Sequence, residues 1–373
     1  MILESVRRCS KSLEPSRVID DLYHVISPPG PVTGHVRPPG SKSLTNRALV
    51  IAALADGHSR LYGVLDSRDT AVMIESLRQL GIEITHDLPS ATIDVTGCAG
   101  RPPAEQATLW LENSGTSMRF LTALVTLGRG QFTLDGNARM RERPLAELVD
   151  ALGKLGVEIA CDADSGGPPV HVVADGLAGG TASISGSISS QFVSGLLMTA
   201  ACARSDTRIT LAGPLVSRPY VEMTVALMKR FGADVRKSTG DTFEVTAGGY
   251  TASDYSVEPD ASAASYFLAA AAITGGRVTV EGLGTDSLQG DVAFAAALVQ
   301  MGCSLEEEER GLTISGGALR GIEIDMNAIS DTAQTLAIVA AFAEGPTRIH
   351  GIAHARVKET DRVAAMVCEF RRL

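Results

Sequence analysis

The sequence predicts an α/β fold in which one α+β unit is repeated and two domains are formed. The same phrase, an amphipathic helix end followed by glycine and an alternating strand, occurs around Gly81, Gly156, Gly232 and Gly302. These glycines are spaced roughly 70 to 76 residues apart, which indicates a repeated supersecondary unit and not a short solenoid repeat. Glycine at this point suits the left-handed backbone conformation that ends many helices.

The first predicted helix covers residues 44–54 and follows a polar turn. Ser43 is expected to cap this helix. Lys42 and Arg47 lie beside its N-terminus, where free backbone N–H groups and the helix dipole favour negative charge. The stretch therefore predicts a small anion site. Taken alone, it is equally well interpreted as a capped helix with two solvated cations. A nucleotide P-loop is set aside, because a serine separates the glycine from Lys42.

Further predicted helices also follow short polar segments. They cover residues 118–127, 192–202, 263–273, 333–342 and 363–370. Alternating segments such as 91–95 and 278–281 predict strands between them. Taken singly, a polar residue at a helix start is usually only a cap. If several of these helix starts meet in one cleft, they predict a site for a substrate with several negative groups.

A chain of 373 residues allows two or three domains. Connections between domains are expected near residues 38–40 and 255–260. The predicted domains are 40–258 and, as the second domain, 25–39 together with 259–373. Residues 1–24 mix acidic and basic side chains, which argues against a transit peptide. That segment is predicted to be a poorly ordered extension or a misplaced start.

Charge and cysteine usage limit the function classes. The formal net charge of -10 argues against a role on nucleic acid or a membrane surface, so the cations for an anionic substrate must be gathered locally. The six cysteines form no CxxC pair and no zinc spacing. A reduced, cytoplasmic protein without a structural metal is the expectation.

The last predicted helix starts near Glu359 and runs to the final residue, Leu373. The next capping glycine of the repeat is due one position later. A helix without its following strand cannot complete a layer. The sequence therefore predicts that the last repeat is missing.

Seven motifs occur in an order that resembles the EPSP synthase (3-phosphoshikimate 1-carboxyvinyltransferase) family from about residue 25 onward. They are the segments 39–43, 113–119, 139–144, 189–192, 217–220, Asp331 and 356–362. The resemblance implies a two-domain enolpyruvyl-transferase fold of βαβαββ units, three per domain, with the active site between the domains. It implies transfer of the enolpyruvyl group of phosphoenolpyruvate to the 5-hydroxyl of shikimate 3-phosphate, with release of phosphate. It also implies no cofactor or metal, a monomer, and glyphosate as a possible inhibitor.

Site residues are carried over from the resemblance alone. Shikimate 3-phosphate is expected to be bound by Lys42, Ser43, Arg47, Ser189, Ser190, Gln191, Ser217, Tyr220, Asp331, His354 and Lys358. Phosphoenolpyruvate is expected to be bound by Lys42, Asn113, Gly115, Thr116, Arg139, Gln191 and Arg362. Asp331 is implied as the acceptor of the hydroxyl proton. Glu359, supported by Lys42, is implied in transfer of the methylene proton.

Three departures from the family pattern affect these expectations. The His-Arg pair and the Lys of the last repeat are not in the sequence, which predicts weak or no activity of this chain. His354 stands where asparagine is common. Phe120 follows Arg119 where a smaller residue is usual, so sensitivity to glyphosate does not carry over.

Two alternative functions stay open at this point. The first is the sister enzyme UDP-N-acetylglucosamine 1-carboxyvinyltransferase, whose catalytic cysteine lies in a loop that Cys98 and its neighbours superficially resemble. That loop belongs after the helix that follows Asn113, where residues 135–144 contain no cysteine. The second is a non-catalytic fragment that binds shikimate 3-phosphate.

Overall fold

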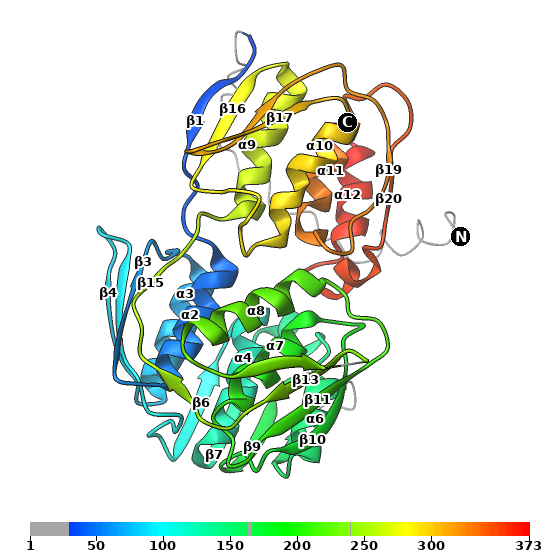
Figure 1. Ribbon diagram of the computed structural model, residues 1–373. Coiled ribbons are helices and arrows are strands. Elements are labelled where there is room, and N and C mark those ends of the chain that lie inside the picture. The colour runs from blue at the N-terminus through cyan, green and yellow to red at the C-terminus, as the bar shows by residue number, and fades with distance from the viewer. Residues whose placement is uncertain (1–29, 163–165, 239) are drawn as a thin grey trace, which may run out of the picture.

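The computed structural model describes residues 30–162, 166–238 and 240–373. The extension predicted for residues 1–24 lies outside these described residues. The chain forms two stacked domains, with the N-terminal strand and the last third of the chain in the upper one (Figure 1). Among the described residues, no helix is long and apolar enough to cross a membrane.

The lower domain is built from three copies of one helix–strand unit, as predicted. The first contains α2 (Lys42–Leu54), β3 (His58–Tyr62), α3 (Arg68–Gln79), β4 (Glu83–Asp87) and β5 (Thr92–Thr96). The second contains β6 (Gln106–Trp110), α4 (Gly115–Leu124), β7 (Arg129–Asp135), α6 (Ala146–Lys154), β8 (Glu158–Cys161) and β9 (Val170–Asp175). The third contains β10 (Gly180–Ser185), α7 (Ser190–Ala200), β11 (Thr207–Ala212), α8 (Arg218–Arg230), β12 (Val235–Ser238) and β13 (Thr242–Val245).

The upper domain contains one unit with the same order and part of another. The first consists of β1 (Thr33–Val36), α9 (Ala261–Thr274), β16 (Arg277–Glu281), η2 (Gly290–Ala293), α10 (Phe294–Gln300), β17 (Ser304–Glu308) and β18 (Gly311–Ser315). The second consists of β19 (Glu323–Asp325), η3 (Ser330–Thr332), α11 (Ala333–Ala340), β20 (Arg348–His350), η4 (Ala353–Val357) and α12 (Arg362–Phe370).

The sheets show how the units are completed. Four sheets have four strands each, in the orders β1-β16-β18-β17, β15-β3-β5-β4, β6-β7-β9-β8 and β10-β11-β13-β12. In every one a parallel pair is extended by an antiparallel hairpin. The first unit borrows its parallel partner β15 (Tyr255–Ser256) from much later in the chain. In the last unit of the described chain, β19 and β20 form a parallel pair that no antiparallel hairpin extends.

The four repeat glycines end helices as the sequence predicts. Gly81, Gly156, Gly232 and Gly302 have φ values of 87°, 87°, 86° and 112°. Glycine reaches these positive values without the steric cost that a Cβ atom brings. The chain can therefore turn directly from each helix into β4, β8, β12 or β17, which confirms the predicted repeat.

Several predicted helix starts are wrong by two or three residues: α4 starts at Gly115 and not at 118, α7 at Ser190 and not at 192, and α9 at Ala261 and not at 263. The cap of α2 is Ser41 and not Ser43: Ser41 has an extended backbone, and its side chain accepts a hydrogen bond from the N–H of Leu44 at 3.4 Å. The last helix starts at Arg362 rather than near Glu359, because Asp361 caps it. Residues 353–357 form a separate short 3-10 helix, η4, before this start.

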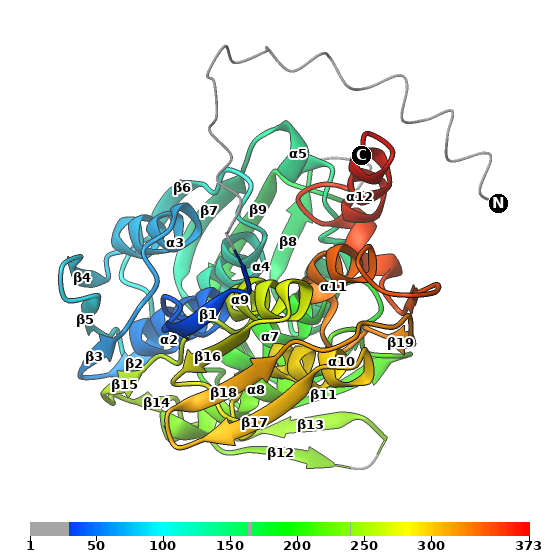
Figure 2. The same cartoon turned by 90° about the horizontal axis from the view of Figure 1, so that it is seen from above.

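The apolar cores of the two domains are unequal. The lower core is continuous, and every residue of α2 from 44 to 54 is buried. In the upper domain α12 has no buried residue, and Val367 on it is 42% exposed. Figure 2 shows α12 at the edge of the upper domain, beside the C-terminus. Its amphipathic face therefore lacks the covering layer that the other repeat helices have.

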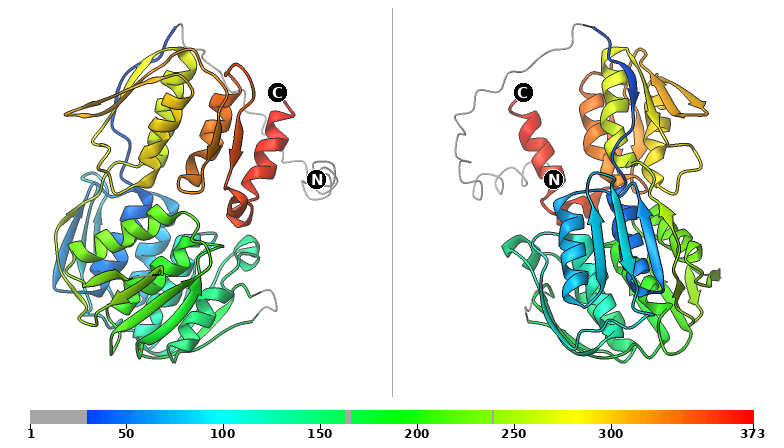
Figure 3. Two further views of the ribbon diagram at one scale, coloured as in Figure 1. Left: turned by 45° about the vertical axis from the view of Figure 1, so that its right-hand side comes forward. Right: turned by 90° about the vertical axis from the view of Figure 1, so that its left-hand side faces the viewer.

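The two segments that connect the domains lie side by side. The N–H of Ser41 donates to the carbonyl oxygen of Glu258 at 2.8 Å, and the N–H of Asp260 donates to the carbonyl oxygen of Pro39 at 2.8 Å. We call this hydrogen-bonded pair of segments the seam. Helices α2 and α9 both start directly after it. In the right-hand view of Figure 3 the dark blue strand β1 leads down toward the blue helix α2 of the lower domain.

Candidate active site

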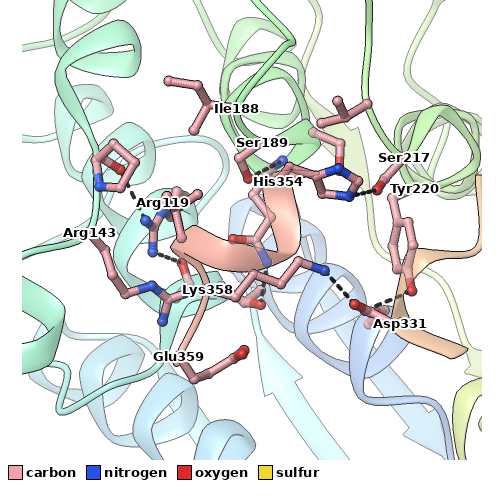
Figure 4. Close-up of a pocket in the computed structure, with 18 of the residues that line it drawn as sticks. Arg119, Arg143, Ile188, Ser189, Ser217, Tyr220, Asp331, His354, Lys358 and Glu359 are labelled. Carbon is pink, nitrogen blue, oxygen red and sulfur yellow. Dashed lines mark hydrogen bonds and ion pairs between the residues drawn. The ribbon is translucent and has the colours of Figure 1, made fainter. Parts of the chain in front are cut away.

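A cleft opens where helix starts of the lower domain face the last unit of the upper domain. Figure 4 shows Arg119 and Arg143 at one end of the drawn region and Asp331 at the other. Sixteen of the predicted site residues line this cleft: Lys42, Ser43, Arg47, Asn113, Gly115, Thr116, Ser189, Ser190, Gln191, Ser217, Tyr220, Asp331, His354, Lys358, Glu359 and Arg362. The structure therefore brings together residues that are separated by more than half of the sequence.

Three buried helices of the lower domain present their N-termini to this cleft. Ser41, Ser114 and Ser189 cap α2, α4 and α7 and accept hydrogen bonds from the N–H groups of their first turns. Free N–H groups and positive dipole ends are thus collected in one place. Gln191, in the first turn of α7, donates to Thr116 Oγ1 at 3.0 Å and links two of these starts.

Arg47 is the most buried cation of the cleft, with only 2% of its surface exposed. Its guanidinium donates to neutral oxygens, at 2.7 Å to Thr224 Oγ1 and at 2.9 Å to the carbonyl of Ser43. It also lies 5.3 Å from the ring centre of Phe120, within cation–π range. Burial lowers the pKa of Arg47 to about 10. A cation held this way is stabilised when an anion binds beside it.

Arg119 and Arg143 are two further buried cations that the sequence analysis did not assign to the site. Arg119 donates to the carbonyl oxygens of Gly115 and Pro144, at 3.2 and 3.0 Å. Arg143 donates to the carbonyl oxygen of Asn113 at 3.0 Å. The Nε atom of each has no hydrogen-bond partner among the described residues. Both arginines stand in the recognised motifs, but their burial depends on how α4 packs against the following loop.

We call Arg47, Arg119 and Arg143 the arginine cluster. No carboxylate of the described residues lies within ion-pair distance of any of the three. Burial lowers the pKa of Arg119 and of Arg143. Repulsion from the charge of Arg143 lowers the pKa of Arg119 further. Unpaired buried charge is costly for a folded protein. Such a cluster is therefore typical of a binding site for anions.

The opposite end of the cleft is built around Asp331 on η3. Its carboxylate is bound by the ammonium of Lys358 and by Arg362 Nη1, the latter at 2.7 Å. Tyr220 donates to the other carboxylate oxygen at 3.0 Å. Burial tends to raise the pKa of Asp331, but the two cations outweigh it and hold the pKa well below its usual range. Asp331 is therefore ionised and able to accept hydrogen bonds or a proton.

His354 fills the space between the two domains near Ser217. Its Nε2 lies 2.9 Å from Ser330 Oγ and 3.2 Å from Ser217 Oγ. Burial, followed by the charge of Lys358, lowers the pKa of His354 to about 4. The imidazole is therefore neutral near pH 7 and bridges two hydroxyl groups, a hydrogen-bonding role that asparagine also fills.

Lys42 and Arg139 remain partly exposed. Lys42 Nζ pairs with Asp69 Oδ2 at 3.0 Å. Arg139, on the short helix α5 (Ala138–Arg141), is the one predicted binding residue outside the set that lines the cleft. It instead donates across the domain boundary to the carbonyl oxygens of Glu359 at 3.1 Å and Lys358 at 2.9 Å.

Gly115 is placed where a side chain does not fit. A Cβ atom built on it lies 2.2 Å from Arg143 Nη2, which is far inside contact distance. Glycine at the start of α4 therefore lets the guanidinium reach the N-terminus of that helix. Among the described residues, no group of three or more His, Cys, Asp or Glu side chains is arranged to hold a metal ion.

Repeated βαβαββ units, two domains and a cleft with buried arginines between them define the class of enolpyruvyl transferases. NikO from Streptomyces tendae, solved as an enolpyruvyl transferase, superposes with a TM-score of 0.66 over 86% of this chain and 75% of its own. At 24% identity this likeness shows the fold only.

Within this class the chain belongs to the EPSP synthase family. The family model described as EPSP synthase (3-phosphoshikimate 1-carboxyvinyltransferase) matches residues 26–373. A 3-phosphoshikimate 1-carboxyvinyltransferase of Marinomonas sp. (strain MWYL1) is 46% identical over 93% of this chain and 82% of its own length. A chloroplastic relative of that name from Solanum lycopersicum is 45% identical, over 100% of this chain and 76% of its own length. EPSP synthase from Acinetobacter baumannii superposes with a TM-score of 0.75 at 27% identity, over 92% of this chain and 78% of its own.

Proposed function

We propose that the cleft transfers the enolpyruvyl group of phosphoenolpyruvate to the 5-hydroxyl of shikimate 3-phosphate and releases phosphate. This is a step of the shikimate pathway, toward chorismate and the aromatic amino acids. The observation that carries the proposal is the arginine cluster, which is buried, has no carboxylate of the described residues within ion-pair distance and lines one cleft with an ionised Asp331. Both substrates carry a phosphate and a carboxylate, which guanidinium groups bind well.

In this proposal different sets of residues bind the two substrates. Arg47 and the N-termini of α2 and α7 bind shikimate 3-phosphate, together with Ser217 and Tyr220. Arg139, Arg362 and the N-terminus of α4 bind phosphoenolpyruvate. Asp331 accepts the proton of the attacking hydroxyl, and elimination of phosphate from the tetrahedral adduct forms the enol ether. Glu359, which Arg362 Nη2 contacts at 2.8 Å, handles the methylene proton with Lys42.

Geometry also bears on the rival sister enzyme. Cys98, the cysteine whose loop superficially resembles the catalytic loop of that enzyme, is outside the residues that line the cleft. Burial raises the pKa of its thiol to about 11, which disfavours the nucleophilic thiolate. Titration with shikimate 3-phosphate and, separately, with UDP-N-acetylglucosamine tests the choice. Binding of the sugar nucleotide alone would reverse it.

Turnover separates an enzyme from a non-catalytic binding protein. The test is phosphate release with both substrates present, compared with either substrate alone. Release only with both supports transfer, whereas tight binding of shikimate 3-phosphate without release supports the binding protein. We further propose that the protein is cytoplasmic, since the described cysteines are all free thiols. We also propose that it is a monomer and that glyphosate competes with phosphoenolpyruvate.

A further inference from the structure

Asp291 on η2 is a buried carboxylate behind the cleft that the proposed reaction does not use. Only 3% of its surface is exposed. Its Oδ2 lies 3.0 Å from Tyr220 Oη and within hydrogen-bond distance of Ser262 Oγ, while Oδ1 has no hydrogen-bond partner among the described residues. A carboxylate this buried normally has a cation or several donors beside it.

The groups that face Asp291 are neutral or negative. Tyr220 comes from α8, Asp331 from η3 and Asp260 from the cap of α9. The adjoining helix α10 (Phe294–Gln300) has no charged side chain. Burial, and then the charge of Asp331, raises the pKa of Asp291 to about 7.

Tyr220 lies between two carboxylates but has only one proton. Its Oη is 3.0 Å from Asp291 Oδ2 and 3.0 Å from Asp331 Oδ2. Two such short contacts need two protons, since oxygen atoms without a proton between them repel. Asp331 is held in its ionised form by Lys358 and Arg362. The second proton therefore belongs on Asp291.

We propose that Asp291 is a positioning residue, which as a neutral carboxylic acid donates to Tyr220 Oη and so directs the Tyr220 proton onto Asp331. The inference rests on the proposed function, in which Asp331 accepts the proton of the substrate hydroxyl. When Asp291 loses its proton, Tyr220 is drawn to the new charge and Asp331 loses a donor that orients it. The rate then falls as pH rises through the pKa of Asp291.

Two substitutions at this position separate positioning from mere packing. Asp291→Asn keeps a donor toward Tyr220 and an acceptor for Ser262 but cannot ionise. Asp291→Ala removes both, and we expect kcat to fall about tenfold, the effect of one lost hydrogen bond, with KM nearly unchanged. Asp291→Asn is expected to restore most of that rate and to abolish the fall in kcat above about pH 7.

Asp286→Asn, which removes an exposed carboxylate of the preceding loop, is the matched control. It is expected to keep the pH profile of the parent protein. If Asp291→Asn shows the same alkaline loss of kcat as the parent protein, the inference is wrong.

A second readout does not depend on turnover. Infrared difference spectra of the parent protein between about pH 6 and about pH 8 should contain the carbonyl band of a carboxylic acid that loses its proton. The band should vanish in Asp291→Asn and persist in Asp286→Asn. If the chain shows no turnover but the band behaves in this way, the proposed function fails and the protonated Asp291 stands. If the parent protein lacks the band, the inference fails whatever the turnover.

Discussion

The two ends of the cleft satisfy their charges in opposite ways. In the lower domain, Arg47, Arg119 and Arg143 are buried against carbonyl and hydroxyl oxygens, and no carboxylate of the described residues lies within ion-pair distance of them. In the upper domain, Asp331 has two cations of its own. The unpaired cations are therefore available to bind anions, whereas the paired carboxylate is available as a proton acceptor. We therefore expect substitutions of the arginines to lower the affinity for anionic substrates, and substitutions around Asp331 to lower the rate of proton transfer.

The sharpest test of that separation, and the largest expected effect, concerns Arg139, which joins the two domains through the carbonyl oxygens of Lys358 and Glu359. Arg139→Ala is expected to lower kcat by about 10²–10³-fold, as expected for one lost electrostatic donor at the reacting group. Affinity for shikimate 3-phosphate, measured by calorimetry, is expected to stay nearly unchanged. Arg141→Ala is the control, because Arg141 pairs with Asp135 at the surface. A large loss of affinity in Arg139→Ala would assign the arginine to the other substrate.

Arg47→Met tests the arginine cluster directly. We expect the Kd for shikimate 3-phosphate to rise about 100-fold, because charge-assisted hydrogen bonds to the ligand are lost. The free energy of unfolding without ligand is expected to change by less than about 1 kcal/mol, since an apolar side chain replaces an unpaired buried charge. Arg60→Met, at an exposed ion pair with Asp94, should change neither quantity appreciably. Equal losses of affinity and stability at Arg47 would show that its role is structural.

His354 makes the interface between the two ends sensitive to acid. Its pKa of about 4 lies below the unfolded value of about 6.5, so the unfolded chain takes up the proton first as pH falls. Stability that is complete above pH 6.5 is therefore lost progressively toward pH 4, by about 1–3 kcal/mol. His354→Asn should reduce that loss in urea unfolding at about pH 7 and pH 5. His350→Asn, at an exposed histidine, should leave that loss of stability unchanged. If His354→Asn also leaves it unchanged, His354 is not its cause.

The smallest effect is expected where the upper domain leaves apolar side chains uncovered. Phe342 is 61% exposed, whereas Phe192 in the lower core is fully buried. Phe342→Ser should lower the free energy of unfolding by less than about 0.5 kcal/mol. Phe192→Ala should lower it by about 3–5 kcal/mol, because it leaves a cavity. Similar values for the two would mean that the upper helices are covered in solution.

Much of this architecture follows from the sequence, because helix caps and repeat glycines are local signals. Gly81 and its three equivalents predicted the repeat, and the seven motifs predicted which side chains share a cleft. The choice of Ser41 over Ser43 as a cap was missed, since both are serines and only backbone conformation distinguishes them. The burial of Arg143 and the contact of Tyr220 with Asp291 depend on packing between segments far apart in the chain, which spacing does not encode.

The paired seam at Ser41 and Asp260 has a mechanical consequence. Because two antiparallel segments are bonded to each other there, any swing of one domain against the other must turn about that line. Lys42, whose N–H donates to Asp260 Oδ2 at 3.0 Å, lies beside that line, so such a rotation would displace it little. The hydrogen bonds from Arg139 to the carbonyl oxygens of Lys358 and Glu359 also cross the domain boundary, so they would have to break if the domains separated there.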